Sequence, residues 1–452
     1  MAVVTIDEAL DWIHSRLKFN IRPGLSRVSA LLDLLDHPEQ HLSMIHVAGT
    51  NGKGSTVAFV RSIFMKAGLK KVASYTSPFI ETFGERMAIN TQPMPDDKII
   101  EYVNLLQPLV AQLDADEKLT GITEFEIITA MGFKYFYDEK VDLAVIEVGL
   151  GGLMDSTNVI QPEVCAITTI GLDHVDILGK TYEAIAAQKA GIIKEGIPVV
   201  SGNIGPEALA VIQKTAQEHH SQLFEFKKAY KIEVLKDECF NFTNDHLNLI
   251  RIEKSLLGFH QIENAAMAIE IADLYAQRVG IPLTEVAIRE GLASAYWPAR
   301  MEQIAESPLT LLDGAHNVHA MKRMLENLKK EQSGKKITIL FSAITTKDIR
   351  HMIEMLNSVE NGQLILTTFD HPKALSLNDF AEYAADGVQY VGDWRKEILD
   401  IRRKCQVDDI FLITGSLYFS SQVREFLLKI CNLEYNKRVV YFFSIMEKYQ
   451  KF

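Results

Sequence analysis

The sequence predicts an α/β fold of two domains, each organised around a mainly parallel β-sheet. From about residue 43 the chain alternates short β-branched runs with longer amphipathic segments, which is the pattern of βαβ units. Residues 221–258 interrupt this pattern with short alternating segments, and it restarts after about residue 300. At 452 residues the chain also exceeds the usual size of one hydrophobic core. We therefore place the domains at 1–296 and 297–452.

Composition limits the class of protein. The chain is 47% hydrophobic and 23% charged, which is typical of a globular protein, and no apolar run has the length of a membrane-spanning helix. The net charge is −12 with scattered lysines and arginines, so no nucleic-acid partner is expected. The cysteines lack metal-ligand spacing and are expected to be reduced: Cys165, Cys239, Cys405 and Cys431. We expect a monomeric cytoplasmic protein without a membrane or nucleic-acid partner.

The elements of the first domain follow from periodicity and capping residues. Thr5 and Glu8 have capping-box spacing and predict an N-terminal amphipathic helix. Val57, Val60 and Ile63 recur at helical spacing after the first strand, and Gly68 is a natural stop. Five apolar runs predict buried strands at 43–48, 71–76, 141–148, 164–170 and 197–202. Ligands of such sheets bind at the carboxyl ends of the strands.

The later elements divide into a small antiparallel patch, two helices and a second set of strands. Alternating segments at 224–235 and 240–253 predict the antiparallel patch, and helices are expected at 261–279 and 283–295. Strands of the second domain are expected at 309–313, 337–343, 363–368 and 410–416.

The segment "HVAGTNGKGS", residues 46–55, is the first candidate site. Glycines allow backbone N–H groups to surround an anion, the following helix start adds positive potential, and Lys53 supplies a full charge. Ser55 could offer its hydroxyl to Mg²⁺. The segment departs from the common phosphate-loop pattern, because Val47 and Gly54 stand where glycine and Ser or Thr are required. The alternative is a glycine-rich turn with an exposed lysine and a helix-capping serine.

Two polar residues follow neighbouring strands. Glu147 ends the apolar run "VDLAVIEV", and its carboxylate suits Mg²⁺, although a solvated strand end would also explain it. His174 lies beside Asp173 after the next strand, as either a metal ligand or an ordinary loop residue.

Lys189 falls on a stripe of apolar helical positions that includes Tyr182, Ile185 and Ile193, whereas Lys194 falls outside it. A lysine on a buried face needs a partner, a shifted pKa or chemical neutralisation. Alternatively, Lys189 is not fully buried, and its side chain extends along the apolar surface so that the ammonium reaches water.

The second domain offers three candidates. Arg300, near Trp297, could bind a phosphate, and Asp313 could hold a ribose or a nearby cation. His316 could be a core histidine or a site residue.

Together these segments resemble the folylpolyglutamate synthases, the folate branch of the Mur ligase family, whose bacterial members often double as dihydrofolate synthases. The resemblance runs in order from about residue 10 to 428 and rests on these segments: "HVAGTNGKGS", "TSPFIETFGERM", "TEFEIITA", "VIEVGLGG", "DSTNVI", "LDHVDILG", "AGIIK", "WPARME", "DGAHN" and "ITGSLY".

The resemblance implies a Mur-type ATPase domain followed by a smaller Rossmann-like glutamate ligase domain. It implies that ATP phosphorylates the terminal carboxylate of tetrahydrofolate, and that L-glutamate attacks the acyl phosphate to form an amide. Dihydropteroate is a further substrate of bifunctional members. The implied cofactors are two Mg²⁺ ions, with ATP as a co-substrate and K⁺ as an optional ion. An active site shared by two domains also implies closure on substrate binding.

The resemblance assigns the nucleotide and metal residues as follows. ATP contacts are Gly49, Thr50, Asn51, Gly52, Lys53, Gly54, Ser55, Asn264, Arg300 and Asp313. The metal ligands are Ser55, Glu147 and His174. The catalytic residues are Lys53, Lys189 and His316, with Lys189 modified to N6-carboxylysine.

Folate residues are carried over in the same way. They are Ser77, Pro78, Phe79, Thr123, Glu124, Phe125, Glu126 and Met154. Leu153 stands where many bifunctional members have Arg, which puts the dihydropteroate activity in question. The tail after about residue 431 has no assigned role.

Three alternatives use the same features. Another Mur-type ligase acting on a cell-wall nucleotide precursor is disfavoured by "TSPFIETFGER" and by the lack of a recognisable domain for a uridine nucleotide. A phosphotransferase or motor ATPase with a phosphate loop would release ADP without needing glutamate. A nucleotide-regulated binding module would leave Glu147, His174 and Lys189 without a shared purpose.

Overall fold

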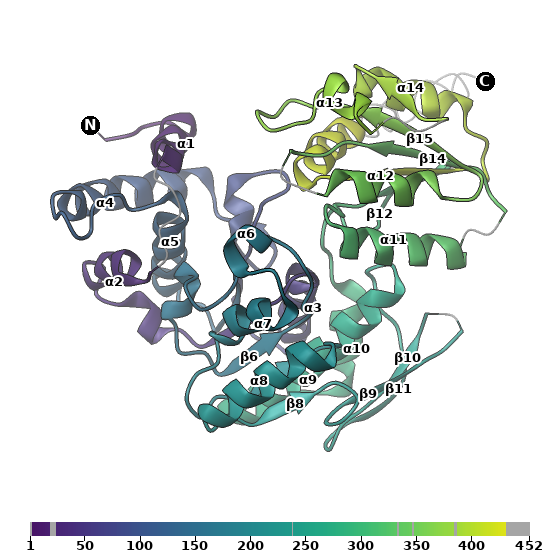
Figure 1. The fold of residues 1–452 in the computed structure, drawn as a ribbon. Helices are drawn as coiled ribbons and strands as arrows, with labels where there is room; N and C mark the ends of the chain where they lie inside the picture. The colour runs from purple at the N-terminus through teal and green to yellow at the C-terminus, as the bar shows by residue number, and fades with distance from the viewer. Residues whose placement is uncertain are drawn as a thin grey trace, which may run out of the picture. The chain divides into compact units, whose positions relative to one another are not determined.

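The computed structural model describes residues 2–430, except 19–23, 237, 332–333, 346–347 and 384–386. The tail after residue 431, Cys431 included, lies outside the described residues. The chain divides into two compact units, Met1–Trp297 and Pro298–Phe452, which are described separately (Figure 1).

The first unit is built on an eight-stranded, mainly parallel sheet with the order β4-β3-β2-β5-β1-β6-β7-β8. Only β3 and β4 run antiparallel to their neighbours. The strands are β1 (Met44–Ala48), β2 (Val72–Tyr75), β3 (Met87–Ile89), β4 (Gln92–Pro93), β5 (Leu143–Glu147), β6 (Val164–Ile167), β7 (Val199–Ser201) and β8 (Leu223–Glu225). The first helix of the chain has its predicted capping box, since Thr5 and Glu8 bond reciprocally.

Helices cover both faces of this sheet because its central strands are apolar on both sides. One face packs against α3 (Lys53–Lys66), α9 (Phe259–Val279) and α10 (Glu285–Ser294). The other packs against α1 (Ile6–His14), α2 (Ser26–Asp33), α4 (Asp96–Asp114), α5 (Glu124–Asp138), α7 (Tyr182–Ala190) and α8 (Pro206–Glu218). The short α6 (Val175–Leu178) precedes α7.

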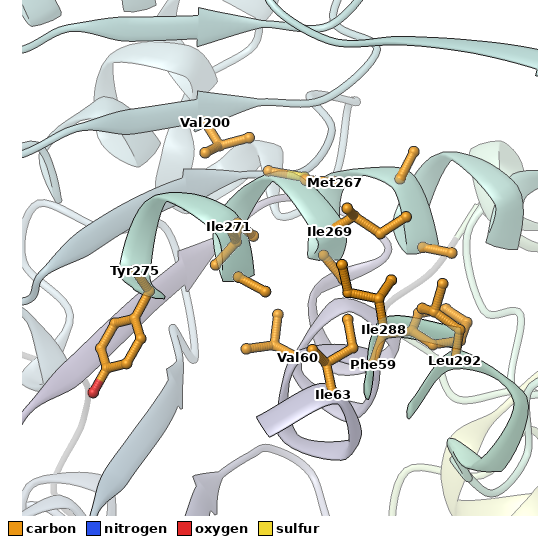
Figure 2. Close-up of a cluster of buried hydrophobic side chains, with 14 of the residues drawn as sticks. Phe59, Val60, Ile63, Val200, Met267, Ile269, Ile271, Tyr275, Ile288 and Leu292 are labelled. Carbon is orange, nitrogen blue, oxygen red and sulfur yellow. The ribbon is translucent and has the colours of Figure 1, made fainter. Parts of the chain in front are cut away.

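The core between α3, α9 and α10 supports the start of α3. Figure 2 shows its side chains converging from the three helices and β7: Phe59, Val60, Ile63, Val200, Met267, Ile269, Ile271, Tyr275, Ile288 and Leu292. Each large apolar side chain buried here stabilises the fold by about 1.5–3 kcal/mol. The phosphate-loop segment is therefore attached to a firmly packed helix.

A three-stranded antiparallel sheet, β11-β10-β9, packs against the same cluster. Its strands are β9 (Lys231–Val234), β10 (Phe240–Thr243) and β11 (Asn248–Ile252). Residues 224 and 225 were predicted to belong to this patch, and that prediction is wrong. They lie in β8 (Leu223–Glu225), a half-buried strand that pairs in parallel with β7 at the edge of the large sheet.

The second unit is a six-stranded sheet with the order β12-β13-β17-β14-β15-β16, parallel except for the β12–β13 pair. The strands are β12 (Glu302–Glu306), β13 (Leu309–Leu312), β14 (Ile337–Phe341), β15 (Gly362–Thr367), β16 (Gln389–Val391) and β17 (Ile410–Thr414). The helices are α11 (Val318–Glu331), α12 (Ile349–Asn357), α13 (Leu377–Ala381) and α14 (Trp394–Lys404), and residues 417–430 are also helical. The predicted α/β class is confirmed.

Among the residues that the model describes, no helix is long and apolar enough to cross a membrane.

Candidate active site

The segment between β1 and α3 has the geometry of an anion site. Helix α3 begins at Lys53, and Gly52 caps it with a φ of 87°, in the left-handed region that glycine tolerates. No side chain caps this helix start. The first backbone N–H groups of the helix and the positive end of its dipole together favour a phosphate at this point.

Two threonines after β6 hold this loop in place. The N–H of Thr50 donates to the carbonyl of Thr169 at 2.8 Å, and the hydroxyl of Thr168 donates to the carbonyl of Asn51 at 2.6 Å. Gly49 must be glycine, because a Cβ there would lie 1.9 Å from Thr168 Oγ1. Sequence reasoning missed both threonines, although two consecutive threonines at a strand end were a usable signal.

Neighbouring side chains also explain the other two glycines of the loop. A Cβ on Gly52 would lie 2.5 Å from Asn264 Oδ1, and one on Gly54 would lie 2.6 Å from Trp297 Cζ2. Asn264 is on α9 and Trp297 follows α10. The common phosphate-loop pattern has Ser or Thr at position 54. This chain has Gly54 instead, and the Trp297 indole packs against it at the start of α3.

Lys53 and Glu147 meet in this loop. The Lys53 ammonium donates to the Gly49 carbonyl at 3.0 Å and lies 3.9 Å from Glu147 Oε1. Glu147, at the end of β5, is only 4% exposed, so the interpretation as a solvated strand end is wrong. The N–H of Ser77 donates to Glu147 Oε2 at 3.4 Å, which connects the loop after β2 to the same carboxylate.

Lys189 is buried, with 4% of its surface exposed, so its side chain does not extend to water. Burial lowers the pKa of Lys189 to about 7, and the nearby positive charge of Lys53 adds to this effect. The carboxylates of Asp173 and Asp155 act in the opposite direction. A large share of the Lys189 amine is thus neutral near pH 7.

The predicted apolar stripe around Lys189 is partly wrong. Ile185 is buried, but Tyr182 is exposed and Ile193 lies beyond the end of α7. The helix ends at Ala190, so a periodic pattern drawn through Ile193 spans a turn.

Asp155 fixes the glycine-rich turn after β5. Its carboxylate accepts from the N–H of Leu150 at 2.8 Å and from the N–H and hydroxyl of Thr157. Burial raises the pKa of Asp155. Asp155 was not among the predicted site residues, although its place as a cap before residues 156–159 was an available signal.

His174 caps the short α6 with a φ of 50°, and its side chain is half exposed. Its Nε2 lies 3.9 Å from Asp173 Oδ1. Within the described residues, no three His, Cys, Asp or Glu side chains are grouped so that they could hold a metal ion. A metal at Glu147 would therefore need further oxygen ligands from phosphates or water.

Phe79, one of the residues assigned to folate by resemblance, belongs to an aromatic cluster. The Phe79 and Phe83 rings lie 6.1 Å apart, with the Arg86 guanidinium 5.2 Å from the Phe79 centroid. The Phe125 ring packs directly on Gly149: a Cβ added to that glycine would lie 2.5 Å from the ring. Met154 is exposed on the turn after β5.

Thr123 and Glu126 have local structural tasks. Thr123 caps α5, and its hydroxyl donates to Glu126 Oε2 at 2.8 Å. The buried Glu126 carboxylate also pairs with Arg27 at 3.0 Å. The Glu126 oxygens are used by the cap and the ion pair, and its assignment to the folate site stays a prediction.

The second unit holds three of the sequence-assigned residues. Asp313, after β13, is buried and accepts from the N–H groups of Met301 and Ala315, both at 2.8 Å. Burial raises the pKa of Asp313, and the charge of Arg300 opposes that shift. The Nδ1 of His316 lies 2.8 Å from the Gly314 carbonyl, to which it donates.

Two protein-family matches show the class of protein to which the chain belongs. Residues 47–272 match the Mur ligase middle domain, and residues 299–417 match the Mur ligase glutamate ligase domain. The chain is thus an ATP-dependent ligase of the Mur type.

Closer relatives then define the family. A dihydrofolate synthase/folylpolyglutamate synthase of Bacillus subtilis is 42% identical over 92% of this chain and 98% of its own length. A solved structure described as an FPGS–AMPPCP–folate complex is 35% identical, with a TM-score of 0.81 over 94% of this chain and all of the other. Escherichia coli FolC in complex with DHPP and ADP is 27% identical, with a TM-score of 0.83 over 94% of this chain and 98% of the other. The chain belongs to the folylpolyglutamate synthase/dihydrofolate synthase family.

Proposed function

We propose that this protein adds L-glutamate to the terminal carboxylate of folates, and also to dihydropteroate, at the expense of ATP. The observation that carries the proposal is the meeting of the phosphate loop and the loop after β2 at one buried carboxylate, Glu147. A nucleotide site alone would not require the second loop. The B. subtilis relative carries both activities in its name, and the solved relatives hold ATP analogues or ADP with folate or DHPP.

The proposed reaction has two steps. The terminal carboxylate oxygen attacks the γ-phosphorus of ATP, an O–P bond forms, and ADP leaves. The amine of L-glutamate then attacks the acyl carbon, loses a proton, and displaces inorganic phosphate as the C–O bond breaks. The backbone N–H groups at the start of α3 and the Lys53 ammonium would neutralise charge on the transferred group.

Magnesium fits the donor set beside the loop. Glu147 offers a hard carboxylate oxygen and Ser55, on the first turn of α3, offers a hydroxyl, which are ligands that Mg²⁺ accepts together with phosphate oxygens and water. The bound ion would supply further neutralisation of the phosphate charge. In this structure the Lys53 ammonium lies 3.9 Å from Glu147 Oε1 and partly offsets the charge of that carboxylate. His174 remains our proposed ligand for the second Mg²⁺ site.

We also propose that Lys189 is carboxylated. A neutral amine can attack carbon dioxide, forming an N–C bond and releasing a proton, and the low pKa of Lys189 keeps much of it neutral. The resulting carbamate would replace a cation that is repelled by Lys53 with an anion that is attracted to it.

Phosphate release with and without L-glutamate tests the proposed function. The assay is run with tetrahydrofolate and, separately, with dihydropteroate. We expect release that depends on both the acceptor and L-glutamate. ATP turnover that ignores glutamate would contradict the ligase proposal and favour a phosphotransferase or an ATPase. Turnover with tetrahydrofolate alone would limit the proposal to folylpolyglutamate synthesis and point to Leu153 as the cause.

A further inference from the structure

The end of α1 reaches the residues assigned to folate. His14 is the last residue of α1, and its Nδ1 lies 3.2 Å from Oε2 of Glu124, the first residue of α5. The His14 side chain is 43% exposed and that of Glu124 is 12% exposed. The imidazole therefore partly shields a carboxylate that lies deeper in the protein.

Aromatic rings and a second cation surround this pair. The His14 and Phe83 rings meet edge to face at 6.3 Å. The Arg86 guanidinium lies over Phe83 and Phe79, and its buried Nε has no hydrogen-bond partner. Glu124 is thus beside the same aromatic cluster that includes Phe79.

The pair is not needed to dock the N-terminal helices. Arg16 makes a two-point ion pair with Asp114 at 2.8 and 3.0 Å and donates to the Ile122 carbonyl at 3.0 Å. The N–H of Val3 is held by Asn104 at 2.8 Å. Loss of one partly exposed hydrogen bond at His14 would leave these contacts intact.

A carboxylate in this place has a chemical use. The pteridine ring of a folate carries a ring N–H and an amino group side by side, and a carboxylate accepts two parallel hydrogen bonds from such an edge. Its orientation matters because misaligned hydrogen bonds weaken steeply.

We propose that His14 is a positioning residue for the folate pteridine ring: it holds the Glu124 carboxylate in the orientation that accepts from the donor edge of the ring. This inference rests on the proposed function. His14 does not contact the reacting atoms, so it affects the KM for the folate and leaves kcat nearly unchanged.

The charge on His14 makes this effect depend on pH. The hydrogen bond to Glu124 raises the pKa of His14, the Glu124 and Asp11 charges support the rise, and burial and Arg86 oppose it. The imidazolium of His14 therefore persists to a higher pH than that of an unperturbed histidine. As pH rises through this pKa, the ion pair becomes a weaker neutral contact, and the KM for the folate should rise.

Steady-state kinetics of the full-length H14Q variant test the proposal. Glutamine keeps a donor but never carries a charge. We expect the KM for tetrahydrofolate to rise about fivefold, with kcat and the KM values for ATP and glutamate within about twofold of wild type. The pH dependence of the folate KM should be lost. E124Q should also raise the folate KM, and adding H14Q to it should have little further effect.

The H351Q variant is the matched control. His351 also pairs with a carboxylate, Asp348 at 2.7 Å, and that hydrogen bond raises its pKa, but it lies on the surface of α12 in the second unit. We expect wild-type kinetics. Equal unfolding midpoints would exclude a folding defect in either variant.

The outcomes separate this inference from the proposed function. Glutamate-dependent turnover in the wild type with an unchanged folate KM in H14Q overturns the inference alone. A fall in kcat at constant KM, or an equal rise in the KM for ATP, also overturns it. No glutamate-dependent turnover in the wild type overturns both.

Discussion

At the scale of single residues, the unusual phosphate loop is explained by its neighbours. Each glycine of the loop has a neighbouring side chain close to the place that a Cβ would occupy. These side chains are Thr168 at Gly49, Asn264 at Gly52 and Trp297 at Gly54. The loop type, Lys53 and the glycine positions were predictable from sequence. The reason for Gly54 was not, because Trp297 is distant in sequence and no local pattern connects the two.

Gly54→Ala should raise the KM for ATP about tenfold, because its Cβ would lie 2.6 Å from the Trp297 ring and displace the start of α3. Adding Trp297→Ala should recover part of this loss. Gly205→Ala is the control, since its Cβ meets nothing within 4 Å and its φ is −62°. An unchanged KM in Gly54→Ala would show that the loop has room for a methyl group.

Lys189→Ala should lower kcat by at least about tenfold, and short carboxylic acids should restore part of it by replacing the carbamate. Lys53→Ala should lose activity without such rescue, because its missing charge is positive. Intact-protein mass measured under carbon dioxide provides an independent readout of carboxylation. Rescue of both variants by the acids would count against the carboxylation proposal. So would a failure to rescue either variant, if the protein mass also shows no added carbon dioxide.

At the scale of secondary-structure elements, the buried strands of the parallel sheets were predictable because they are apolar, and the long helices because they are periodic. The strands β12 and β16 were not predicted: β12 is mostly polar, β16 has only three residues, and each pairs with one neighbour at a sheet edge. The ends of elements were also less predictable, as at α7. Tertiary contacts, rather than local pattern, determine these features.

One buried carboxylate on α9 makes stability depend on pH. Burial raises the pKa of Glu270 to about 7, helped by Asp273 and Asp245 and opposed by Asn244 and His246. The folded protein therefore keeps a proton that the unfolded chain loses, and the stability contribution falls as pH rises from the unfolded pKa toward 7. Glu270 receives a hydrogen bond from Asn244 at 2.8 Å, which glutamine could also accept.

Glu270→Gln should remove this part of the pH dependence. The free energy of unfolding should decrease in the wild type when the pH is raised from about 5 to about 8. In the variant this decrease should be smaller, by on the order of 2 kcal/mol. Denaturant unfolding at both pH values measures the difference. Glu285→Gln, on the surface of α10, should behave as wild type. Parallel pH profiles for Glu270→Gln and wild type would contradict the assignment.

At the scale of the whole molecule, both halves of the chain match Mur ligase domains, and the match to the B. subtilis relative spans nearly its full length. The reaction class could be inferred from sequence because many short segments of one family occur in the right order. Residues such as Thr168, Asp155 and His14 were not given roles that way, since those roles depend on contacts made by the fold.

The most direct test of the account follows an oxygen atom. Tetrahydrofolate is prepared with a heavy-oxygen label in its terminal carboxylate, and the phosphate released in the presence of ATP and L-glutamate is analysed by mass spectrometry. If the carboxylate is phosphorylated and then attacked by the amine, one labelled oxygen leaves with the phosphate. Unlabelled phosphate would mean that ATP is cleaved without forming an acyl phosphate, and would contradict the proposed ligase mechanism.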